Sequence, residues 1–320
     1  GGTIDKLESI PGFRTDLSRS EFLERVRAHG MALADHTEDM VPADRILYEL
    51  RDVTSTVDSL PLIVASIMSK KIAGGAQGIV IDVKTGAGAF LPRLEDSRRL
   101  AQSLVAIGAS LGRSMSALIT DMSQPLGRNV GNALEVAEAI DTLRGDGPDD
   151  LAELCCALGG ELLVFAGEAT TPKEGSQQLA RLLQNGAAMD RFRELIVHQA
   201  GDPAVLDDPS LLPTPRSTCE VCASTSGTVS GLNALSIGKA ANLLGAGRFT
   251  KEDSIDPAVG VELLCKVGDS VEKGLPLARL HVNREDQLEA VQRMVREAYA
   301  IDPAGAPHTP PPLIVERVVG

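Results

Sequence analysis

The sequence predicts an α/β protein with a mainly parallel mixed sheet, a partial helical domain and a small C-terminal α+β module. The first observation is the order of patterns over residues 78–140. There a strand-like run, a glycine-rich loop, a helical repeat, a second strand-like run and a second helical repeat follow one another. This βαβα order is typical of a domain built on a parallel sheet. The second observation is a change of composition after Arg216, where short strand-like pieces alternate with glycine-rich turns.

The first predicted strand covers residues 78–83, which are β-branched and almost continuously apolar, and it enters the glycine-rich segment 85–89. Such a run is typical of a buried parallel strand. An amphipathic helix running to about Gly112 is predicted next, because apolar residues recur at helical spacing, namely Leu100, Leu104, Ile107 and Leu111. Residues 115–120 form the next predicted strand, and a helical pattern resumes near Gly131.

Further helices are predicted on both sides of this core. Residues 58–61 indicate a helix start, since polar capping residues precede a proline that the first turn tolerates, and Gly74 ends that helix. Long apolar repeats over 148–199 predict two or three helices. Four prolines make residues 200–215 an irregular linker.

The C-terminal part alternates short strands with turns over residues 260–281. A helix from about Glu285 to Ala300 is predicted to follow, and a proline-rich tail ends the chain. Together these elements form the predicted α+β module.

Composition limits the classes of function. With 320 residues, of which 43% are apolar, the chain can form two or three domains with buried cores. Its formal net charge of −13, from 31 basic and 44 acidic residues, argues against nucleic acid and anionic membranes as partners. No run approaches the ~20 apolar residues that span a bilayer. No basic and apolar leader opens the chain, so we expect a cytoplasmic protein.

Several motifs give only weak signals. The five cysteines are too few for a disulfide framework, and a reducing compartment fits them. Cys219 and Cys222 have CxxC spacing, but no second pair or nearby histidine completes a metal site, so a structural role is predicted. Backbone N–H groups near Thr3 and in the segment 86–88 could bind phosphate, although neither segment completes a nucleotide-binding fingerprint.

Three polar residues form the most interesting candidate site. Ser66 and Lys70 lie four residues apart on a predicted helix and therefore share one face, and Arg51 precedes them. A hydroxyl, an ammonium and a planar guanidinium group could together bind a small ring that carries carbonyl oxygens and an imide N–H. Alternatively, Arg51 and Lys70 are solvated surface charges and Ser66 lets helices approach. Spacing alone leaves both interpretations open.

Motifs along essentially the whole chain resemble the signature of thymidine and pyrimidine-nucleoside phosphorylases, in the same order. They are residues 1–12 (Gly-Gly-Thr-Ile-Asp-Lys-Leu-Glu-Ser-Ile-Pro-Gly), 41–44 (Val-Pro-Ala-Asp), 51–63 (Arg-Asp-Val-Thr-Ser-Thr-Val-Asp-Ser-Leu-Pro-Leu-Ile), 82–90 (Asp-Val-Lys-Thr-Gly-Ala-Gly-Ala-Phe), 120–127 (Thr-Asp-Met-Ser-Gln-Pro-Leu-Gly) and 131–136 (Gly-Asn-Ala-Leu-Glu-Val). The Gly-Asp-Ser-Val turn at 268–271 is similar to the family's C-terminal hammerhead domain.

The resemblance implies reversible phosphorolysis, in which phosphate displaces the base from C1′ of a pyrimidine nucleoside. The products are the free base and a (deoxy)ribose 1-phosphate. The family's base-binding residues match Ser66 and the two catalytic cations Arg51 and Lys70, which would stabilise negative charge on the departing base. By the same resemblance, Tyr48, Ile63 and Phe90 line the base, Thr3 binds phosphate, and Leu126, Asn129 and Glu138 hold a monovalent cation.

The resemblance also implies a domain organisation. An α/β domain would cover 1–40 and 74–215, a small helical domain would be represented by 41–73, and a hammerhead-like module would cover 216–320. Family members begin with a further N-terminal segment that carries a Lys-His-Ser-Thr-Gly-Gly phosphate loop. We therefore expect the complete enzyme, a homodimer without an organic cofactor, to be active, and the isolated 320 residues to be inactive until that segment is supplied.

Two alternatives remain open at this point. A nucleoside-monophosphate (AMP-type) phosphorylase has a similar core and performs the same kind of glycosyl transfer. A truncated paralogue without catalytic activity would instead act as a dimerisation module. The sequence also leaves open whether thymidine alone is used or uridine as well.

Overall fold

The computed structural model describes residues 2–34, 41–44, 46–47, 59–248, 250 and 253–320. Its helices, including the short 3-10 helices η1 and η2, are α1 (Thr3–Leu7), α2 (Arg19–His29), α4 (Leu60–Ala73), α5 (Leu94–Ser110), α6 (Asn132–Arg144), α7 (Asp149–Phe165), α8 (Pro172–Gln184), α9 (Ala187–His198), η1 (Pro203–Leu206), η2 (Pro209–Leu211), α10 (Ala234–Leu244) and α11 (Leu288–Ala298). Its strands are β1 (Gly78–Thr85), β2 (Ser114–Asp121), β3 (Asn129–Val130), β4 (Ser217–Cys222), β5 (Gly227–Leu232), β6 (Gly260–Leu263), β7 (Ser270–Val271), β8 (Pro276–Val282), β9 (Tyr299–Asp302) and β10 (Ile314–Val319).

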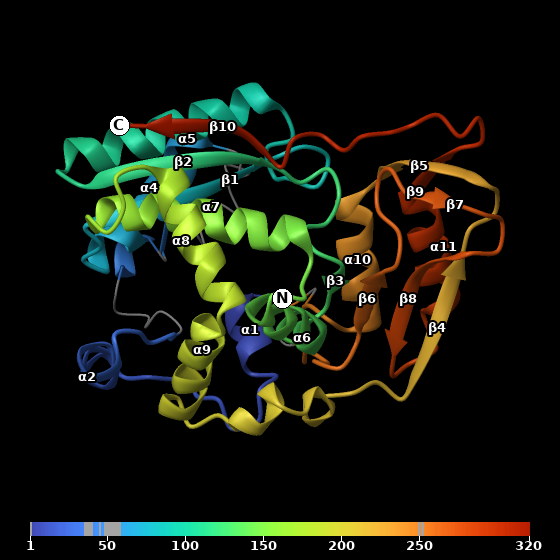
Figure 1. Cartoon of the computed structure of the whole chain (residues 1–320), viewed down its shortest axis with the longest axis horizontal. Helices are drawn as coiled ribbons and strands as arrows, with labels where there is room; N and C mark the ends of the chain where they lie inside the picture. The colour runs from blue at the N-terminus through green and yellow to red at the C-terminus, as the bar shows by residue number, and fades with distance from the viewer. Residues whose placement is uncertain (1, 35–40, 45, 48–58, 249, 251–252) are drawn as a thin grey trace.

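The central sheet has the strand order β1-β2-β10. β1 and β2 are parallel, from Gly78 opposite Ser114 to Thr85 opposite Asp121. β10 is antiparallel to β2, so the sheet is mixed. α5 covers one face of the sheet and α7 the other (Figure 1). The elements follow in the predicted order β1-α5-β2-α6, which confirms the α/β class.

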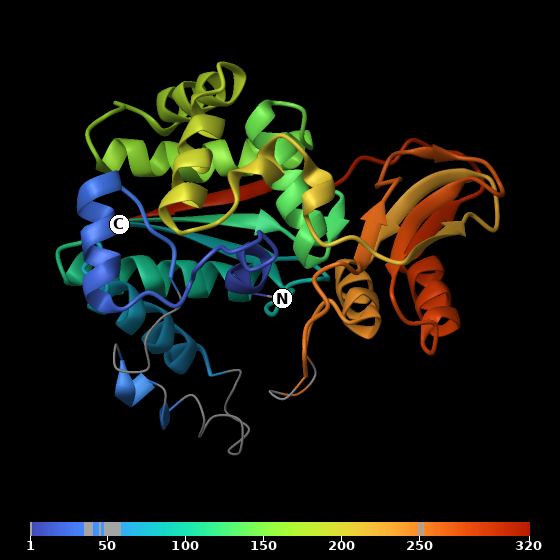
Figure 2. The same cartoon turned by 90° about the horizontal axis from the view of Figure 1, so that it is seen from below.

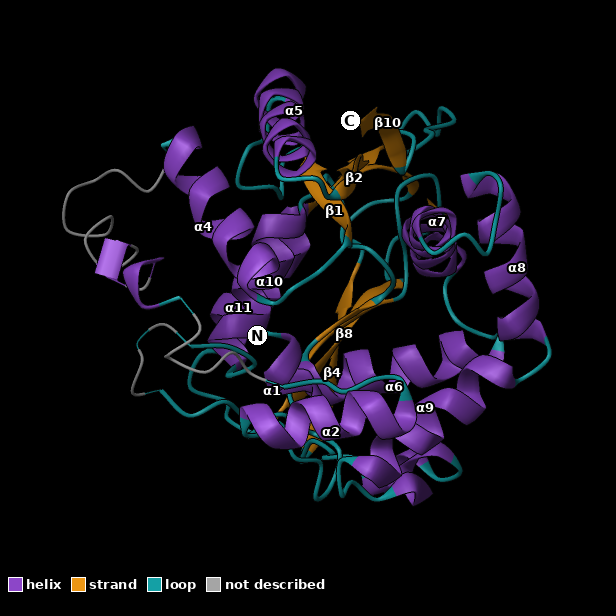
Figure 3. Cartoon of the chain, turned by 90° about the vertical axis from the view of Figure 1, so that its left-hand side faces the viewer, coloured by secondary structure: helices purple, strands orange, loops and turns teal. Residues whose placement is uncertain are grey.

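The helix α4 lies beside α5, on the same side of the central sheet (Figures 2 and 3). It begins after Ser59, has Pro61 in its first turn and ends at Gly74, as the sequence predicts. Its buried Val64 and Met68 join the apolar cluster formed by α5 and the central sheet. This packing fixes the rotation of α4, and with it the direction of its polar side chains.

The helix α5 buries only part of the stripe that its large side chains indicated, since Leu104 is fully buried and Leu100 packs against the same core. Ile107 and Leu111 are exposed, whereas Gly108 is buried. A Cβ atom on Gly108 would lie 2.2 Å from Cγ of Met115 on β2, so glycine lets the helix approach the strand closely. The prediction of a helix is confirmed, but Ile107 and Leu111 are not part of its buried stripe, because small residues face the sheet there.

Residues 200–215, predicted as an irregular linker, pack against the rest of the protein. Asp202 and Asp208 accept hydrogen bonds at the starts of η1 and η2. Three apolar side chains of this segment join a buried cluster with residues of α1, α6 and α9, namely Val205, Leu206 and Leu212. The segment is therefore part of a core and not a free connection.

The chain ends in a strand that follows the prolines of the predicted tail and that the sequence analysis did not predict. Neighbouring strand residues point to opposite faces of a sheet. In β10, Glu316 accordingly pairs with Arg98 on α5, and Arg317 pairs with Glu161 on α7. The β-branched residues after the prolines explain the strand, because they complete the edge of β2.

The C-terminal module contains an antiparallel sheet of order β3-β6-β8-β4, a second antiparallel sheet of order β7-β5-β9, and the helices α10 and α11 (Figure 1). Its own core confirms the predicted α+β character. β3 reaches this module from the first part of the chain, and β10 returns to the central sheet. The domain division at residue 216 stays a prediction.

All five cysteines are free thiols. Gln292 Nε2 donates a hydrogen bond to Cys219 Sγ at 2.8 Å, so this thiol has a structural contact. In the part of the chain that the structure describes, no group of three or more His, Cys, Asp or Glu residues is arranged to hold a metal ion. No helix in that part combines the length and the apolar character needed to cross a membrane.

Candidate active site

The helix α4 presents three of the predicted site residues on one face. Ile63, Ser66 and Lys70 follow one another at spacings of three and four, which aligns them along the helix. Ser66 is buried, and Ile63 and Lys70 are partly buried. The structure therefore places Ile63, Ser66 and Lys70 along one helix, whereas Phe90 lies in the glycine-rich segment after β1. Tyr48 and Arg51, two further predicted residues of that site, lie outside the described residues.

Asp44 joins this group and was not recognised from the sequence. Its Oδ2 atom lies 2.9 Å from Lys70 Nζ and accepts a hydrogen bond from Ser66 Oγ at 3.1 Å. Lys70 Nζ also donates to Ser66 Oγ at 3.3 Å. Asp44 precedes Ser66 by 22 residues, so helical spacing gave no signal for this contact.

The Asp44 carboxylate, whose side chain is 10% exposed, has a clear physical role in this cluster. It compensates the charge of Lys70 and holds the ammonium and hydroxyl groups at a fixed separation. Two polar groups of this kind suit neighbouring polar atoms on one edge of a small planar ring. The arrangement favours the binding interpretation of Ser66 and Lys70 over that of solvated surface groups.

The glycine-rich loop after β1 is shaped by close backbone contacts. Gly88 N–H donates to Met122 O at 2.9 Å, and a Cβ atom on Gly88 would lie 2.4 Å from the same oxygen. Gly86 adopts a φ of +96°, which favours glycine. Two residues beyond Gly88, Phe90 is 62% exposed. The loop thus presents an aromatic ring at the surface, and the base-lining role of Phe90 stays a prediction.

Thr3 is the first residue of α1 and is exposed. The short helix is held by Leu7, which is buried, and by an ion pair of 2.5 Å between Lys6 Nζ and Glu135 Oε2 of α6. Thr3 therefore lies at an accessible position on a segment that is fixed to the α/β part.

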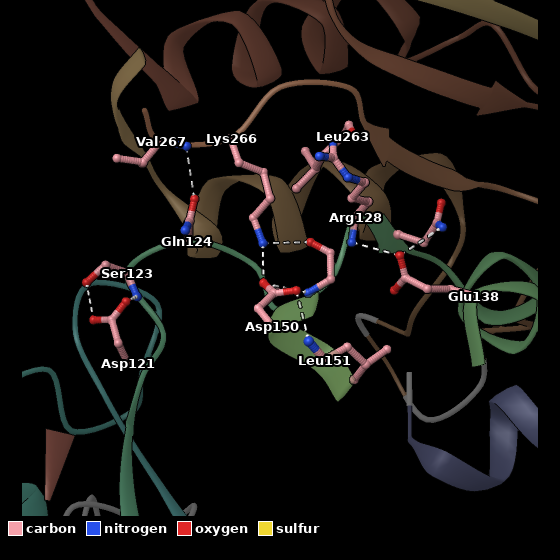
Figure 4. A network of polar contacts seen from close by, with 12 residues as sticks. Asp121, Ser123, Gln124, Arg128, Glu138, Asp150, Leu151, Leu263, Lys266 and Val267 are labelled. Atoms are coloured by element: carbon pink, nitrogen blue, oxygen red, sulfur yellow. Dashed lines mark hydrogen bonds and ion pairs between the residues drawn. The ribbon is translucent and has the colours of Figure 1, made fainter. Parts of the chain in front are cut away.

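The predicted cation ligands lie in the segment between β2 and α6, which carries Leu126 and Asn129, and on α6 itself, which carries Glu138. Glu138 Oε1 accepts hydrogen bonds from Arg128 N–H at 2.8 Å and from Asn129 Nδ2 at 3.1 Å (Figure 4). Burial raises the pKa of Glu138, and the nearby Glu135 raises it further, while these hydrogen bonds lower it. Leu126 precedes this contact in the same loop. Asn129 and Glu138 are thus brought together.

An open cavity of about 380 Å³ lies beside this loop. Most of its lining side chains are acidic, and the lining residues are Arg128, Asn129, Glu138, Asp141, Asp146, Gly147, Pro148, Asp149 and Glu262. Glu138 and Asn129 belong to this cavity, whereas Ser66, Lys70 and Phe90 do not. The cavity therefore does not mark the proposed base site.

The mixed sheet with helices on both faces belongs to a class of glycosyl-transferring proteins, and the α+β module is appended to it. The family described as "Glycosyl transferase family, a/b domain" matches residues 1–189, and the "Pyrimidine nucleoside phosphorylase C-terminal domain" matches residues 228–302. The chain belongs to the pyrimidine-nucleoside phosphorylase family, which confirms the resemblance that its motifs indicated.

Three curated relatives illustrate the similarity. The pyrimidine-nucleoside phosphorylase of Bacillus subtilis (strain 168) is 50% identical over 316 residues, which are 99% of this chain and 73% of the relative. The enzyme of the same name from Staphylococcus haemolyticus (strain JCSC1435) is 51% identical over 294 residues, or 92% of this chain and 68% of the relative. That from Geobacillus stearothermophilus is 47% identical over 318 residues, or 99% and 73%.

Proposed function

We propose that the protein catalyses the reversible phosphorolysis of pyrimidine nucleosides. The observation that carries this proposal is the cluster that Ser66 and Lys70 of α4 form with Asp44, in a chain of the pyrimidine-nucleoside phosphorylase family. Such a cluster suits the polar edge of a pyrimidine. The reaction itself needs no organic cofactor, since phosphate is the second substrate.

In this mechanism a phosphate oxygen forms a bond to C1′ of the sugar while the bond from C1′ to the base nitrogen breaks. The electron pair of that bond goes to the pyrimidine ring, which takes up a proton to become the free base. Lys70, together with Arg51, stabilises the negative charge on the ring, and this charge is larger in the transition state than in the substrate. Ser66 orients the ring, Phe90, Tyr48 and Ile63 line it, and Thr3 binds phosphate.

The proposal predicts phosphate-dependent release of uracil from uridine, of thymine from thymidine, or of both by the natural full-length protein. Absorbance or chromatography of the free base measures this release, and omission of phosphate is the control. AMP and CMP in the same assay test the nucleoside-monophosphate alternative. Turnover of a monophosphate without turnover of either nucleoside would contradict the proposal, and no turnover of any substrate would favour the dimerisation module.

We also propose that a monovalent cation binds at the loop between β2 and α6. The buried Glu138 supports this, because a backbone N–H and a neutral amide hold its carboxylate. Glu138 would supply a charged ligand, and the main-chain carbonyl groups of Leu126 and Asn129 would supply neutral ones. When bound, the cation would compensate the buried charge and stiffen the loop.

If a monovalent cation binds at this loop, KCl should increase the phosphorolysis rate more than choline chloride does at equal ionic strength. Protonation of Glu138 removes the charged ligand, and its raised pKa brings this protonation closer to neutral pH. The K⁺ concentration that gives half of the maximal effect should therefore rise as the pH falls. Glu138→Gln keeps the hydrogen-bond acceptor but lacks the charge, and should abolish the dependence. A dependence that persists in this variant would exclude Glu138 as the ligand.

The remaining features of the proposal concern assembly and location. We propose a homodimer in the cytoplasm, and the free cysteines agree with a reducing compartment. Size-exclusion chromatography with light scattering measures the oligomeric state directly.

A further inference from the structure

The C-terminal module holds the loop between β2 and α6, residues 122–131, at several points. Three backbone N–H groups of the module donate hydrogen bonds to this loop: Ala234 to Ser123 O at 3.2 Å, Leu263 to Arg128 O at 2.7 Å, and Val267 to Gln124 Oε1 at 3.1 Å. The last of these is drawn in Figure 4. The pairing of β3 with β6 continues this contact. The conformation of the loop therefore depends on a module that is distant in sequence.

Lys266 makes the central charged contact of this interface. Its Nζ atom donates to Gly127 O at 2.9 Å and forms an ion pair with Asp150 Oδ2 in the first turn of α7 (Figure 4). Asp150 Oδ2 also accepts a hydrogen bond from Gly127 N–H at 3.3 Å. The Lys266 side chain is only 13% exposed, so water screens these interactions weakly. One ammonium group thus joins the module, the loop and α7.

The same loop is attached to the glycine-rich loop that precedes Phe90. Met122 N–H donates to Thr85 O at 2.7 Å, and Met122 O accepts from Gly88 N–H at 2.9 Å. A Cβ atom on Gly86 would lie 2.5 Å from Ser123 Oγ, so the two loops are in tight contact. A displacement of the loop 122–131 would consequently displace the glycine-rich loop.

We propose that Lys266 is a positioning residue for nucleoside binding, acting through the loop 122–131 on the glycine-rich loop and Phe90. Lys266 itself does not touch the substrate in this scheme. Charge-assisted hydrogen bonds are about twice as strong as neutral ones, which explains why a lysine at this interface can fix a loop whose other contacts are mainly between backbone groups. The kinetic consequence rests on the proposed phosphorolysis.

The first test replaces Lys266 by methionine, which keeps most of the side-chain volume but removes the ammonium group. Because Phe90 would contact the base in substrate and transition state alike, KM for the nucleoside should rise about 3- to 30-fold while kcat changes little. A loss of folded protein alone would instead lower apparent kcat and leave KM unchanged. Lys266→Arg can donate to both acceptors and should restore most of the loss in KM.

Lys273 provides the matched control, because it is an exposed lysine in a turn of the same module. Lys273→Met should leave KM and kcat at the values of the unchanged protein. Asp150→Asn removes the negative charge that pairs with Lys266 and should also raise KM for the nucleoside. This variant gives a second test if Lys266→Met does not fold. Unchanged KM in Asp150→Asn, or equal KM values for Lys266→Met and Lys273→Met, would overturn the proposal.

Hydrogen exchange followed by mass spectrometry gives a readout that does not need activity. Lys266→Met should accelerate exchange in peptides that cover 122–131 and 85–90, but not in the strands β8 and β4. Unchanged exchange in both loops would overturn the positioning role. If the unchanged protein shows no phosphorolysis, the proposed function fails, and the exchange experiment still decides the role of Lys266.

Discussion

Replacing Arg317 by alanine should lower the free energy of unfolding by about 3–5 kcal/mol. The Arg317 guanidinium group binds both carboxylate oxygens of Glu161, with Nη2 lying 2.8 Å from Oε2. Glu161 is only 1% exposed, so Arg317→Ala leaves a buried charge without its cationic partner between α7 and the central sheet. Urea unfolding of the two proteins at neutral pH measures the difference.

Arg98→Ala is the matched control for this prediction. Arg98 binds Glu316, the neighbour of Arg317 in β10, with contacts of 2.8 and 3.0 Å. The Glu316 side chain is 33% exposed, whereas that of Glu161 is 2% exposed, although Arg317 at 44% is more exposed than Arg98 at 33%. A pair in which both charged groups stay in contact with water contributes only about 0–1 kcal/mol, so this variant should remain close to the unchanged protein. Replacing Arg317 and Glu161 together by methionine removes both charges and should recover most of the stability. Equal losses in Arg317→Ala and Arg98→Ala would contradict the explanation by burial.

Lys70→Ala should lower kcat/KM for the nucleoside by about 10- to 150-fold, because a hydrogen bond to a charged group contributes roughly 1.5–3 kcal/mol. Most of the loss is expected in kcat, since Lys70 would act on charge that develops as the base departs. Steady-state phosphorolysis of uridine and thymidine by the natural full-length protein measures the effect, and Arg51→Ala should behave in the same way.

Two further variants separate this role from general effects on α4. Lys71 is exposed on the same helix, and Lys71→Ala should leave the kinetics unchanged. Ser66→Ala should be milder than Lys70→Ala, since a neutral hydrogen bond contributes about 0.5–1.5 kcal/mol. Far-UV circular dichroism should show the same helix content in all variants. Normal turnover by Lys70→Ala would rule out the proposed base site.

The sequence by itself determined the local elements and the family. The β-branched run of β1 and its parallel partner β2, the start of α4 at Pro61 and the shared face of Ser66 and Lys70 all follow from patterns within a few residues. The alternation of side chains along a strand and their spacing along a helix follow from backbone geometry, so both appear as periodic patterns in the sequence. The family motifs indicated the reaction, because they occur along the chain in the same order as in the pyrimidine-nucleoside phosphorylases.

Only the tertiary structure decided the partners of these elements. Asp44 meets Ser66 across 22 residues, Lys266 meets Gly127 across 139, and Arg317 meets Glu161 across 156. The tail became a strand because the edge of β2 was open to it, and α5 turned Gly108 toward the sheet because no larger residue fits against Met115. Contacts of this kind depend on how distant segments pack against each other, and local sequence patterns do not predict that packing.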